Sequence, residues 1–580
     1  MILCKKGDSY VFKELQHNTY YVIKKISEKR HTENERRSDM NTACIIPTRM
    51  RRGSCLSLDG EWDFEFSREM FTPSVFDMHI EVPFPPESEA SGVACWHSKG
   101  TYLNYRKIFS LPLGFKTDGE VLLHFGAISP QADVWLNGKF VGSHYGSDLP
   151  FSFSVAHLLK QENVLCVRVY DERSAPILYG RERRRISFGE SFSGIWQSVT
   201  LEHIPKGGIY GISVTASDTE AKITVDSTSK SLAIRYEDGE EQVTLSFTRE
   251  IVIRPKSIRP WSPEEPNLYP FTVFSPTDEV TSYFALRRFE SREENGVRRF
   301  YLNGHAYPLH GVLDNGFFEG GISAPTEEDG YSVHIESIKA LGFNAVRRHK
   351  ILAAPAFYEA CDRLGLIVFQ DVAFDRHYAF RPKHADPVSW FEAIHTRLRR
   401  EKSRTKEIFR HYIRTLLEHL SFYPSLCLLT VYNEELSTLD ARHVYAELKP
   451  KHPQLLLSLK GRYSAEGQDA PTDHLDAAYK GNLSRAKKPV ILTGVGDFTA
   501  STSKKSRDSV QKRTTERFVA LYEKEVIPAL REGAAGCIFT QLKDSPTASN
   551  GIYTVDGKAC RIEKKEALRI SSLVRAAFEK

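Results

Sequence analysis

The 580-residue chain is longer than one hydrophobic core usually supports, so we expect three or four domains. Its hydrophobic share of 41%, charged share of 26% and net charge of +5 are typical of a soluble globular protein and do not favour a nucleic-acid partner. No run of about 18 apolar residues occurs, which argues against a membrane-spanning helix.

Nine cysteines are scattered along the chain without a CxxC pair. This pattern favours reduced thiols in a cytoplasm over a disulfide framework, and it offers no zinc-ligand spacing, so we expect neither a metal nor a cofactor. Residues 1–50 are polar, mixed in charge and without the apolar core of a signal peptide. We expect a loosely ordered N-terminal extension there, with Met40 as an alternative first residue.

The pattern of residues 51–205 predicts a β-sandwich. LDGEWDFEF (residues 58–66) alternates apolar and polar residues, and more strand-like runs follow between turn signals. Asn137-Gly138 is the dipeptide typical of a two-residue hairpin turn. Residues 206–286 repeat this style over a length typical of a small immunoglobulin-like sandwich.

From residue 287 to residue 580, strand-like runs alternate with helical patterns, which is typical of a parallel α/β architecture. Eight such units over about 290 residues predict a (β/α)8 barrel. The eight expected strands are AYPLHGVL, FNAVRRH, LIVFQDV, SLCLLTVYNE, LLLSLKG, DHLDAAY, PVILTGVGD and GCIFTQL.

The fourth expected strand of this barrel, residues 425–434, ends in Asn433 and Glu434. Such a strand tip faces the active-site mouth of an α/β barrel. A carboxylate at that place can protonate a departing oxygen, and cleavage of a glycosidic bond by the usual route needs a second carboxylate. The sequence therefore indicates one candidate general acid, Glu434, which requires a partner.

The chain resembles glycoside hydrolase family 2, the β-galactosidase and β-glucuronidase family, over about residues 55–580. The motifs that carry the resemblance are SLDGEWDFEF, VPFPPE, VWLNGKFVG, SGIWQSVTLE, PWSPEEPNLY, GVLDNGF, LGFNAVRRHK, YEACDRLGLIVFQD, YPSLCLLTVYNEE and TQLKD with NGIYTVD. The resemblance implies a jelly-roll-like sugar-binding sandwich, an immunoglobulin-like sandwich and a TIM barrel. It also implies a retaining exo-β-glycosidase that acts on a carbohydrate, and a homo-oligomer, because relatives often assemble.

Carried over residue by residue, the family acid/base is implied at Glu434, and the contact to the sugar 2-hydroxyl at Asn433. The family nucleophile, a Glu on strand seven, aligns with Gly494, which has no side chain to attack an anomeric carbon. Asp497 would sit at the carboxyl separation of an inverting enzyme, roughly 6.5–9.5 Å, and activate a water. Its alternative role is that of a turn or N-cap aspartate. Two further candidates for the missing carboxylate are Glu466 and Asp469.

Other candidate ligand contacts come from the remaining strand ends. His349, which ends strand two beside Arg347 and Arg348, is implied by the resemblance to touch the sugar. Asp371 at the end of strand three and Asp314 after strand one are candidate acceptors for sugar hydroxyls, because an unpaired buried polar group costs about 1–3 kcal/mol.

The last two strand ends add further candidates. Tyr479 near strand six matches a family tyrosine that is implied to lie beside the nucleophile, and Gln541 and Asp544 end strand eight. Phe539 stands near the family's aromatic platform and would partly restore sugar stacking. Arg347 and Asp544 have the alternative of structural ion pairs at the rim.

Two interpretations follow from these residues. In the first, a cytoplasmic family 2 β-glycosidase hydrolyses O-glycosidic bonds of a β-glycoside or oligosaccharide, with activity weakened or lost at Gly494. In the second, a catalytically silent relative binds sugars or partners through the same fold. Loss of a nucleophile commonly costs several orders of magnitude in rate, so the two differ in whether turnover survives.

Overall fold

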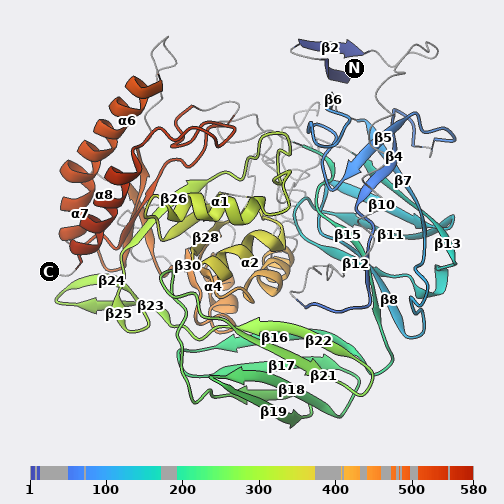
Figure 1. Cartoon of the computed structure of the whole chain (residues 1–580), viewed down its shortest axis with the longest axis horizontal. Helices are drawn as coiled ribbons and strands as arrows, with labels where there is room; N and C mark the ends of the chain where they lie inside the picture. The colour runs from blue at the N-terminus through green and yellow to red at the C-terminus, as the bar shows by residue number, and fades with distance from the viewer. Residues whose placement is uncertain are drawn as a thin grey trace, which may run out of the picture.

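The computed structural model describes three units that lie side by side, with the first sandwich at the right of Figure 1, the second sandwich below, and the barrel at the left. The described residues are 2–6, 9–13, 50–70, 73–98, 100–170, 192–349, 351–372, 407, 410–431, 441–458, 472–478, 483, 486–496, 507–545 and 549–578.

The first sandwich packs a six-stranded sheet (order β11-β10-β13-β7-β4-β5) against a four-stranded sheet (β12-β8-β15-β3). Apolar residues alternate along the strands, so that Trp62, Phe64 and Tyr105 are fully buried between the sheets. Asn137 and Gly138 join β10 to β11 with φ of 53° and 77°, which confirms the predicted hairpin turn. The strands are β3 (Cys55–Ser57), β4 (Gly60–Ser67), β5 (Met78–Val82), β6 (Cys95–His97), β7 (Tyr102–Ser110), β8 (Glu120–Phe125), β9 (Ile128–Ser129), β10 (Gln131–Leu136), β11 (Lys139–Tyr145), β12 (Phe151–Ser154), β13 (Glu162–Tyr170), β14 (Gly194–Ile195) and β15 (Val199–Ile204).

The second sandwich pairs a three-stranded sheet (β16-β17-β20) with a four-stranded sheet (β19-β18-β21-β22), an arrangement of immunoglobulin-like type. Tyr269 and Phe284 stack in its core with 4.9 Å between their ring centroids. The strands are β16 (Ile209–Ala216), β17 (Ala221–Ser227), β18 (Leu232–Asp238), β19 (Glu241–Phe247), β20 (Glu250–Ile253), β21 (Tyr269–Phe274) and β22 (Glu279–Phe284).

Eight parallel strands form the barrel in the order β30-β29-β28-β27-β26-β33-β32-β31, which confirms the predicted TIM-barrel class. The ladder is open only between β30 and β31. There the Asp473 amide donates to the Leu457 carbonyl at 2.7 Å, and the Leu457 amide donates to Asp473 Oδ2 at 2.9 Å. The strands are β26 (Leu309–Asp314), β27 (Ala345–Arg348), β28 (Ile367–Asp371), β29 (Leu426–Thr430), β30 (Leu456–Ser458), β31 (Leu475–Ala478), β32 (Val490–Val495) and β33 (Gly536–Phe539).

Helices follow the strands and cover the outside of the barrel (Figure 1). The sequence sets their limits locally: α2 has a proline in its first turn and ends at Gly365, whose φ is 76°. The helices are α1 (Gly330–Lys339), α2 (Pro355–Leu364), α4 (Ala441–Leu448), α6 (Arg507–Leu521), the π-helical turn η3 (Tyr522–Val526), α7 (Ile527–Arg531) and α8 (Lys564–Ala576), and residues 410–420 are also helical.

A small antiparallel sheet closes the amino-terminal end of the barrel. It comprises β23 (Phe289–Glu294), β24 (Val297–Leu302) and β25 (His305–Ala306), and its apolar residues join one core cluster with the barrel interior. Trp261 of the PWSP motif is buried in the same cluster and donates its indole N–H to the Asp362 carbonyl at 2.7 Å. This motif therefore anchors the second sandwich to the barrel.

Residues 50–54 connect all three units. Met50 is buried in the core of the second sandwich, and Arg51 exchanges two backbone hydrogen bonds with Thr281 of β22. The Arg51 side chain reaches Glu359 of α2 at 2.7 Å, so the same segment also contacts the barrel.

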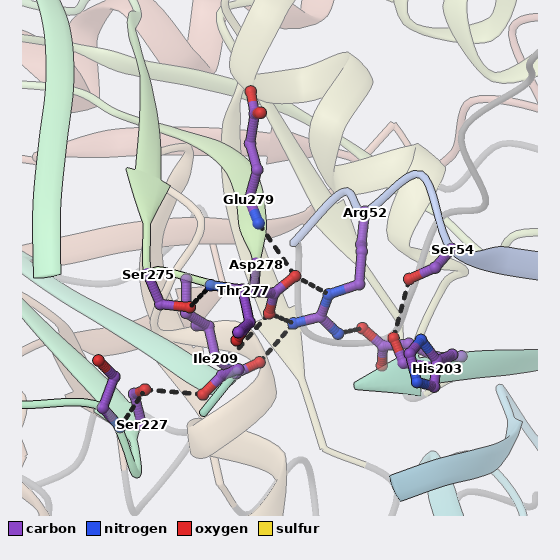
Figure 2. A network of polar contacts seen from close by, with 12 residues as sticks. Arg52, Ser54, His203, Ile209, Ser227, Ser275, Thr277, Asp278 and Glu279 are labelled. Atoms are coloured by element: carbon purple, nitrogen blue, oxygen red, sulfur yellow. Dashed lines mark hydrogen bonds and ion pairs between the residues drawn. The ribbon is translucent and has the colours of Figure 1, made fainter. Parts of the chain in front are cut away.

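Arg52 lies between the two sandwiches, facing Asp278 in Figure 2. Its Nε donates to Asp278 Oδ1 at 3.0 Å, its Nη2 to Asp278 Oδ2 at 2.8 Å, and its Nη1 to Glu202. The second oxygen of Glu202 accepts from His124 at 2.9 Å, and Asp278 also accepts from the Ile209 amide at 2.8 Å. We call Arg52, His124, Glu202 and Asp278 the joint cluster, and none of these side chains is more than 5% exposed.

Two strands also lie within the N-terminal extension. Strand β1 (Ile2–Lys6) forms a hairpin with β2 (Ser9–Lys13) and pairs with β6 of the first sandwich. Cys95 of β6 is disulfide-bonded, so the expectation of reduced thiols throughout is wrong at this position. In the described part of the chain, no helix is long and apolar enough to cross a membrane.

Candidate active site

The first sandwich bounds one side of the barrel mouth. Its Trp96, Phe192 and Trp196 share an apolar cluster with Ile322 from the loop after β26 and Ile351 from the loop after β27. These loops follow the carboxyl ends of barrel strands, where ligands of this fold bind. A ligand in the mouth would therefore lie close to the sandwich.

Four buried side chains form a polar group at the carboxyl ends of the barrel strands, which we call the lumen cluster: Arg347, His349, Asp371 and Asp476. Arg347 Nε donates to both oxygens of Asp371 at 3.0 and 2.9 Å, and its Nη1 donates to Asp476 Oδ2 at 2.8 Å. His349 Nδ1 donates to Asp371 Oδ2 at 3.1 Å. The exposed fractions are 4%, 7%, 0% and 6% in that order, so all four side chains are shielded from solvent.

The two carboxyls of the lumen cluster differ in their electrostatics. Burial alone would raise the pKa of Asp371, but the charge of Arg347 and the hydrogen bond from His349 outweigh it and hold the pKa below its ordinary value. Burial, opposed by Arg347 and reinforced by the charge of Asp371, raises the pKa of Asp476 to about 6. One guanidinium thus keeps one carboxyl ionised while the other titrates near neutrality.

Sequence patterns did not single out Asp476. The available signal was an aspartate inside strand six, two residues after His474, so that both side chains face the same side of the strand. The rings of His474 and Phe369 of β28 form a T-shaped contact with 5.3 Å between ring centroids, and the Arg347 guanidinium lies 4.3 Å from the centroid of the Phe369 ring. The side chains of His474 and Arg347 therefore both pack against Phe369 in the apolar interior of the barrel.

Arg348 and Asp314 lie on the opposite, helix-facing side of their strands. Arg348 Nη1 and His334 Nε2 donate to Asp314 Oδ2 at 2.9 and 3.1 Å, and the Gly316 amide donates to Asp314 Oδ1 at 2.9 Å. Burial alone would raise the pKa of Asp314, but the charges of His334 and Arg348 hold it well below the ordinary value. Protein donors thus occupy both oxygens of Asp314, as they do both oxygens of Asp371, so a contact from Asp314 to a sugar stays a prediction.

Strand eight gives a second polar group at the rim. Gln541 is fully buried, accepts a hydrogen bond from Asn315 of the loop after β26, and donates to Asn550. Asp544 pairs with Arg561 at 2.6 Å, so Asp544, like Arg347, forms the ion pair expected as its alternative role.

Phe539 does not face the mouth. It is 1% exposed and packs against Phe518 of α6, with 5.4 Å between ring centroids. The expectation that Phe539 offers a stacking platform for a sugar is wrong, because at this position of β33 the side chain points outward to the helices.

Gly494 lies in a bulge of β32. Three residue steps on β32, from Leu492 to Val495, stand opposite two on β33, from Cys537 to Phe539. Gly494 has a φ of 72° and is exposed, and no atom of the described residues would lie within 4 Å of an added Cβ. The position aligned with the family nucleophile is therefore open, and its backbone is in the left-handed region that favours glycine.

Several candidate residues lie outside the described residues: Asn433, Glu434, Glu466, Asp469, Tyr479 and Asp497. The structure describes the chain up to Val431 after β29, so the roles of these residues stay predictions. Among the residues that are described, no group of three or more His, Cys, Asp or Glu is placed to hold a metal ion.

Two family models match the chain. The model "Glycosyl hydrolases family 2, sugar binding domain" covers residues 45–205, and "Glycosyl hydrolases family 2" covers residues 199–287. The β-galactosidase of Lactobacillus delbrueckii subsp. bulgaricus is 30% identical over 335 residues, and that of Arthrobacter sp. (strain B7) is 25% identical over 374 residues. These alignments cover 53% and 60% of this chain but 31% and 34% of the relatives, so the chain spans about a third of their length.

Solved structures share the fold over most of the chain. The β-glucuronidase of an uncultured Clostridium sp. superposes with a TM-score of 0.70 at 17% identity, covering 90% of this chain and 98% of that one. A β-galacturonidase from Eisenbergiella tayi with bound glycerol gives 0.64 at 17% identity, covering 90% and 96%. At these identities the likeness shows the fold alone. Residues 45–287 thus match the two models of glycoside hydrolase family 2, and the fold likeness extends the similarity over the rest of the chain.

Proposed function

We propose that this protein binds a β-glycoside at its barrel mouth and hydrolyses the O-glycosidic bond weakly or not at all. Relatives named β-galactosidase, β-glucuronidase and β-galacturonidase support a carbohydrate as the ligand. Glu434 and Asn433 are the proposed acid/base and 2-hydroxyl contact, with His349, Asp371, Tyr479 and Gln541 as further ligand contacts.

The observation that carries this proposal is the bulge at Gly494. A retaining glycosidase needs two carboxyls roughly 5–5.5 Å apart, and the strand-seven carboxylate is missing here. The backbone at Gly494 is bulged and left-handed, so a side chain added there would not stand on an extended strand. Asp497 is the proposed carboxylate for any remaining activity, by activating a water in an inverting reaction.

Chromogenic substrates test the proposal on the full chain. We expect nitrophenyl β-galactoside, β-glucoside, β-glucuronide and β-mannoside to be hydrolysed several orders of magnitude more slowly than by an enzyme with both carboxylates. Residual hydrolysis that disappears in Glu434→Gln would support the weak-enzyme form, and rapid hydrolysis would contradict the proposal.

Azide separates a weak enzyme from a silent binding protein. Azide would occupy the open space at Gly494, attack the anomeric carbon and form a C–N bond as the C–O bond to a dinitrophenolate breaks, giving a glycosyl azide of inverted configuration. We expect this product if the remaining pocket is intact. Binding of a thioglycoside without any glycosyl azide would favour the second function, a catalytically silent carbohydrate-binding protein.

The cytoplasmic location and the homo-oligomer remain predictions. Fractionation of the natural cell tests the first, and light scattering of the purified chain tests the second. The disulfide at Cys95 is the observation that weighs against a reducing compartment.

A further inference from the structure

The contact between Arg347 and Asp476 crosses the interior of the barrel. Strand β27, which carries Arg347, and strand β31, which carries Asp476, are separated by three strands in either direction around the barrel. Their side chains nevertheless meet at 2.8 Å. Arg347 is therefore held from two sides, by Asp371 of the neighbouring strand and by Asp476 of the opposite wall.

A charged residue at this place requires an explanation. The interior of such a barrel is usually filled by bulky branched side chains, and a buried ion pair often adds no stability over apolar residues of similar volume. Asp476 has a further cost, because its Oδ1 has no hydrogen-bond partner among the described residues. A purely structural ion pair would be expected to use both oxygens of the carboxylate, so that role does not explain why Oδ1 has no partner among the described residues.

The hydrogen bonds of Asp371 indicate what Asp476 does. Asp371 Oδ2 accepts both from Arg347 Nε at 2.9 Å and from His349 Nδ1 at 3.1 Å, so a shift of the guanidinium also moves the oxygen that orients the His349 ring. Asp476 is the second anchor of that guanidinium, and it approaches from the other wall.

We propose that Asp476 is a positioning residue: it holds Arg347 from the far wall of the barrel and thereby fixes the Asp371 carboxylate and the His349 ring for a bound sugar. The sugar in this statement rests on the proposed function. The geometry within the lumen cluster does not depend on it.

Protonation of Asp476 would weaken this contact, because a neutral carboxyl attracts the guanidinium less. The described titratable groups around Asp476 are Arg347 of β27, His349 directly after β27, Asp371 of β28 and His474 directly before β31. Burial lowers the pKa of His474 to about 3, so this ring stays neutral. With the pKa of Asp476 raised to about 6, sugar affinity is expected to fall between pH 7.5 and pH 5, and to fall less in Asp476→Asn.

Two variants and one control test the role. Asp476→Ser removes the contact to Arg347, whereas Asp476→Asn keeps an acceptor and removes only the charge. Asp278→Asn removes one carboxylate from Arg52 in the joint cluster and leaves the barrel untouched. Crystal structures are determined for each full chain, and titration calorimetry measures the affinity for a non-hydrolysable phenyl β-thioglycoside of each sugar named above.

We expect Asp476→Ser to displace Arg347 and turn His349 away from Asp371, and to weaken thioglycoside binding by about tenfold. Asp476→Asn should keep most of the geometry and lose about threefold, and Asp278→Asn should bind as the wild type does. Such partial recovery by the conservative variant, with its flatter pH profile, separates positioning from a general loss of stability.

Unchanged positions of Arg347, Asp371 and His349 in Asp476→Ser would overturn the inference, whether or not a sugar binds. If Asp476→Ser does not fold, the test rests on Asp476→Asn. Wild-type thioglycoside affinity with the wild-type pH profile in that variant would overturn the inference. A wild-type chain that binds no thioglycoside overturns the proposed function instead, and the crystal comparison still decides the role of Asp476.

Discussion

The joint cluster and the lumen cluster have the same set of groups. In each, a buried arginine lies between two carboxylates, and one of these carboxylates also accepts a hydrogen bond from a histidine. Arg52 is held by Glu202 and Asp278, and Arg347 by Asp371 and Asp476. The two clusters differ in how many of their carboxylate oxygens accept a hydrogen bond.

In the joint cluster, each carboxylate oxygen has at least one donor. Both oxygens of Asp278 accept from Arg52, and backbone amides, among them that of Ile209, supply further donors. In the lumen cluster, Asp476 Oδ1 has no partner among the described residues. Next to the cluster, the same holds for both ring nitrogens of His474. The comparison shows a cluster between two domains whose acceptors all have donors, and a cluster in the barrel that keeps one acceptor without a donor among the described residues.

The largest expected effect is on the joint cluster. Arg52→Ala leaves Glu202 and Asp278 buried without their cation, and we expect the free energy of unfolding to fall by about 3–5 kcal/mol. Urea denaturation measures the loss. Arg51→Ala is the matched control, because its side chain is 48% exposed and such ion pairs contribute about 0–1 kcal/mol. Equal losses in both variants would show that the joint cluster contributes no special stability.

A buried carboxyl that accepts its hydrogen bonds from a tyrosine sharpens the comparison further. Asp148 accepts hydrogen bonds from the Tyr412 hydroxyl at 2.9 and 3.1 Å, and burial raises the pKa of Asp148 to about 7. The folded state therefore binds a proton that the unfolded state releases, so the stability contribution is complete below about pH 4 and is lost as the pH rises to about 7.

In Asp148→Asn this dependence disappears. We expect the stability of the variant relative to the wild type to rise by about 3–4 kcal/mol between pH 4 and pH 8 and then to level off. Thermal unfolding of both proteins across this range measures it. A difference that stays constant with pH would mean that Asp148 titrates at its ordinary pKa.

Substitution of two glycines by alanine tests how much free space surrounds the joint cluster and the barrel mouth. A Cβ on Gly208 would lie 2.7 Å from the Pro205 carbonyl and 2.9 Å from Asp278 Oδ2, whereas a Cβ on Gly494 would meet no atom within 4 Å in the described part of the chain. We expect Gly208→Ala to lose about 1–3 kcal/mol of stability through overpacking. Gly494→Ala should lose about 1 kcal/mol, from its left-handed backbone alone. Chemical denaturation distinguishes them, and a larger loss at Gly494 would contradict the open mouth.

The smallest expected effect is that of Gly494→Glu on hydrolysis, for which we expect no gain of activity. Gly494→Glu restores the family's side chain, but the bulge and the φ of 72° do not restore an extended strand. We expect no recovery of hydrolysis of nitrophenyl β-glycosides, with a stability cost of about 1 kcal/mol. Recovery would show that the side chain alone was lost.

The fold could be predicted largely from local sequence patterns. Apolar runs bounded by turn residues gave the barrel strands, Asn137-Gly138 gave a hairpin, and the PWSP motif contains the tryptophan that anchors the second sandwich. Each of these features is decided by neighbouring residues, which is why the sequence carries it.

The candidate site depended on information that local patterns lack. Arg347 and Asp476 are 129 residues apart, and only closure of the barrel brings them together. The direction of the Phe539 side chain depends on strand register, in which one residue separates the interior from the helix side. The left-handed backbone at Gly494 reflects a bulge against β33, which a single strand's sequence does not reveal.

The segment of residues 50–54 has a consequence for protein engineering. Met50 packs with the second sandwich although it precedes the first one in the chain, and Arg52 needs a carboxylate from each. A chimera that receives the first sandwich from another family member must therefore retain these five residues from the same parent as its second sandwich. Otherwise the chimera would bury Arg52 between the two sandwiches without one of its carboxylate partners.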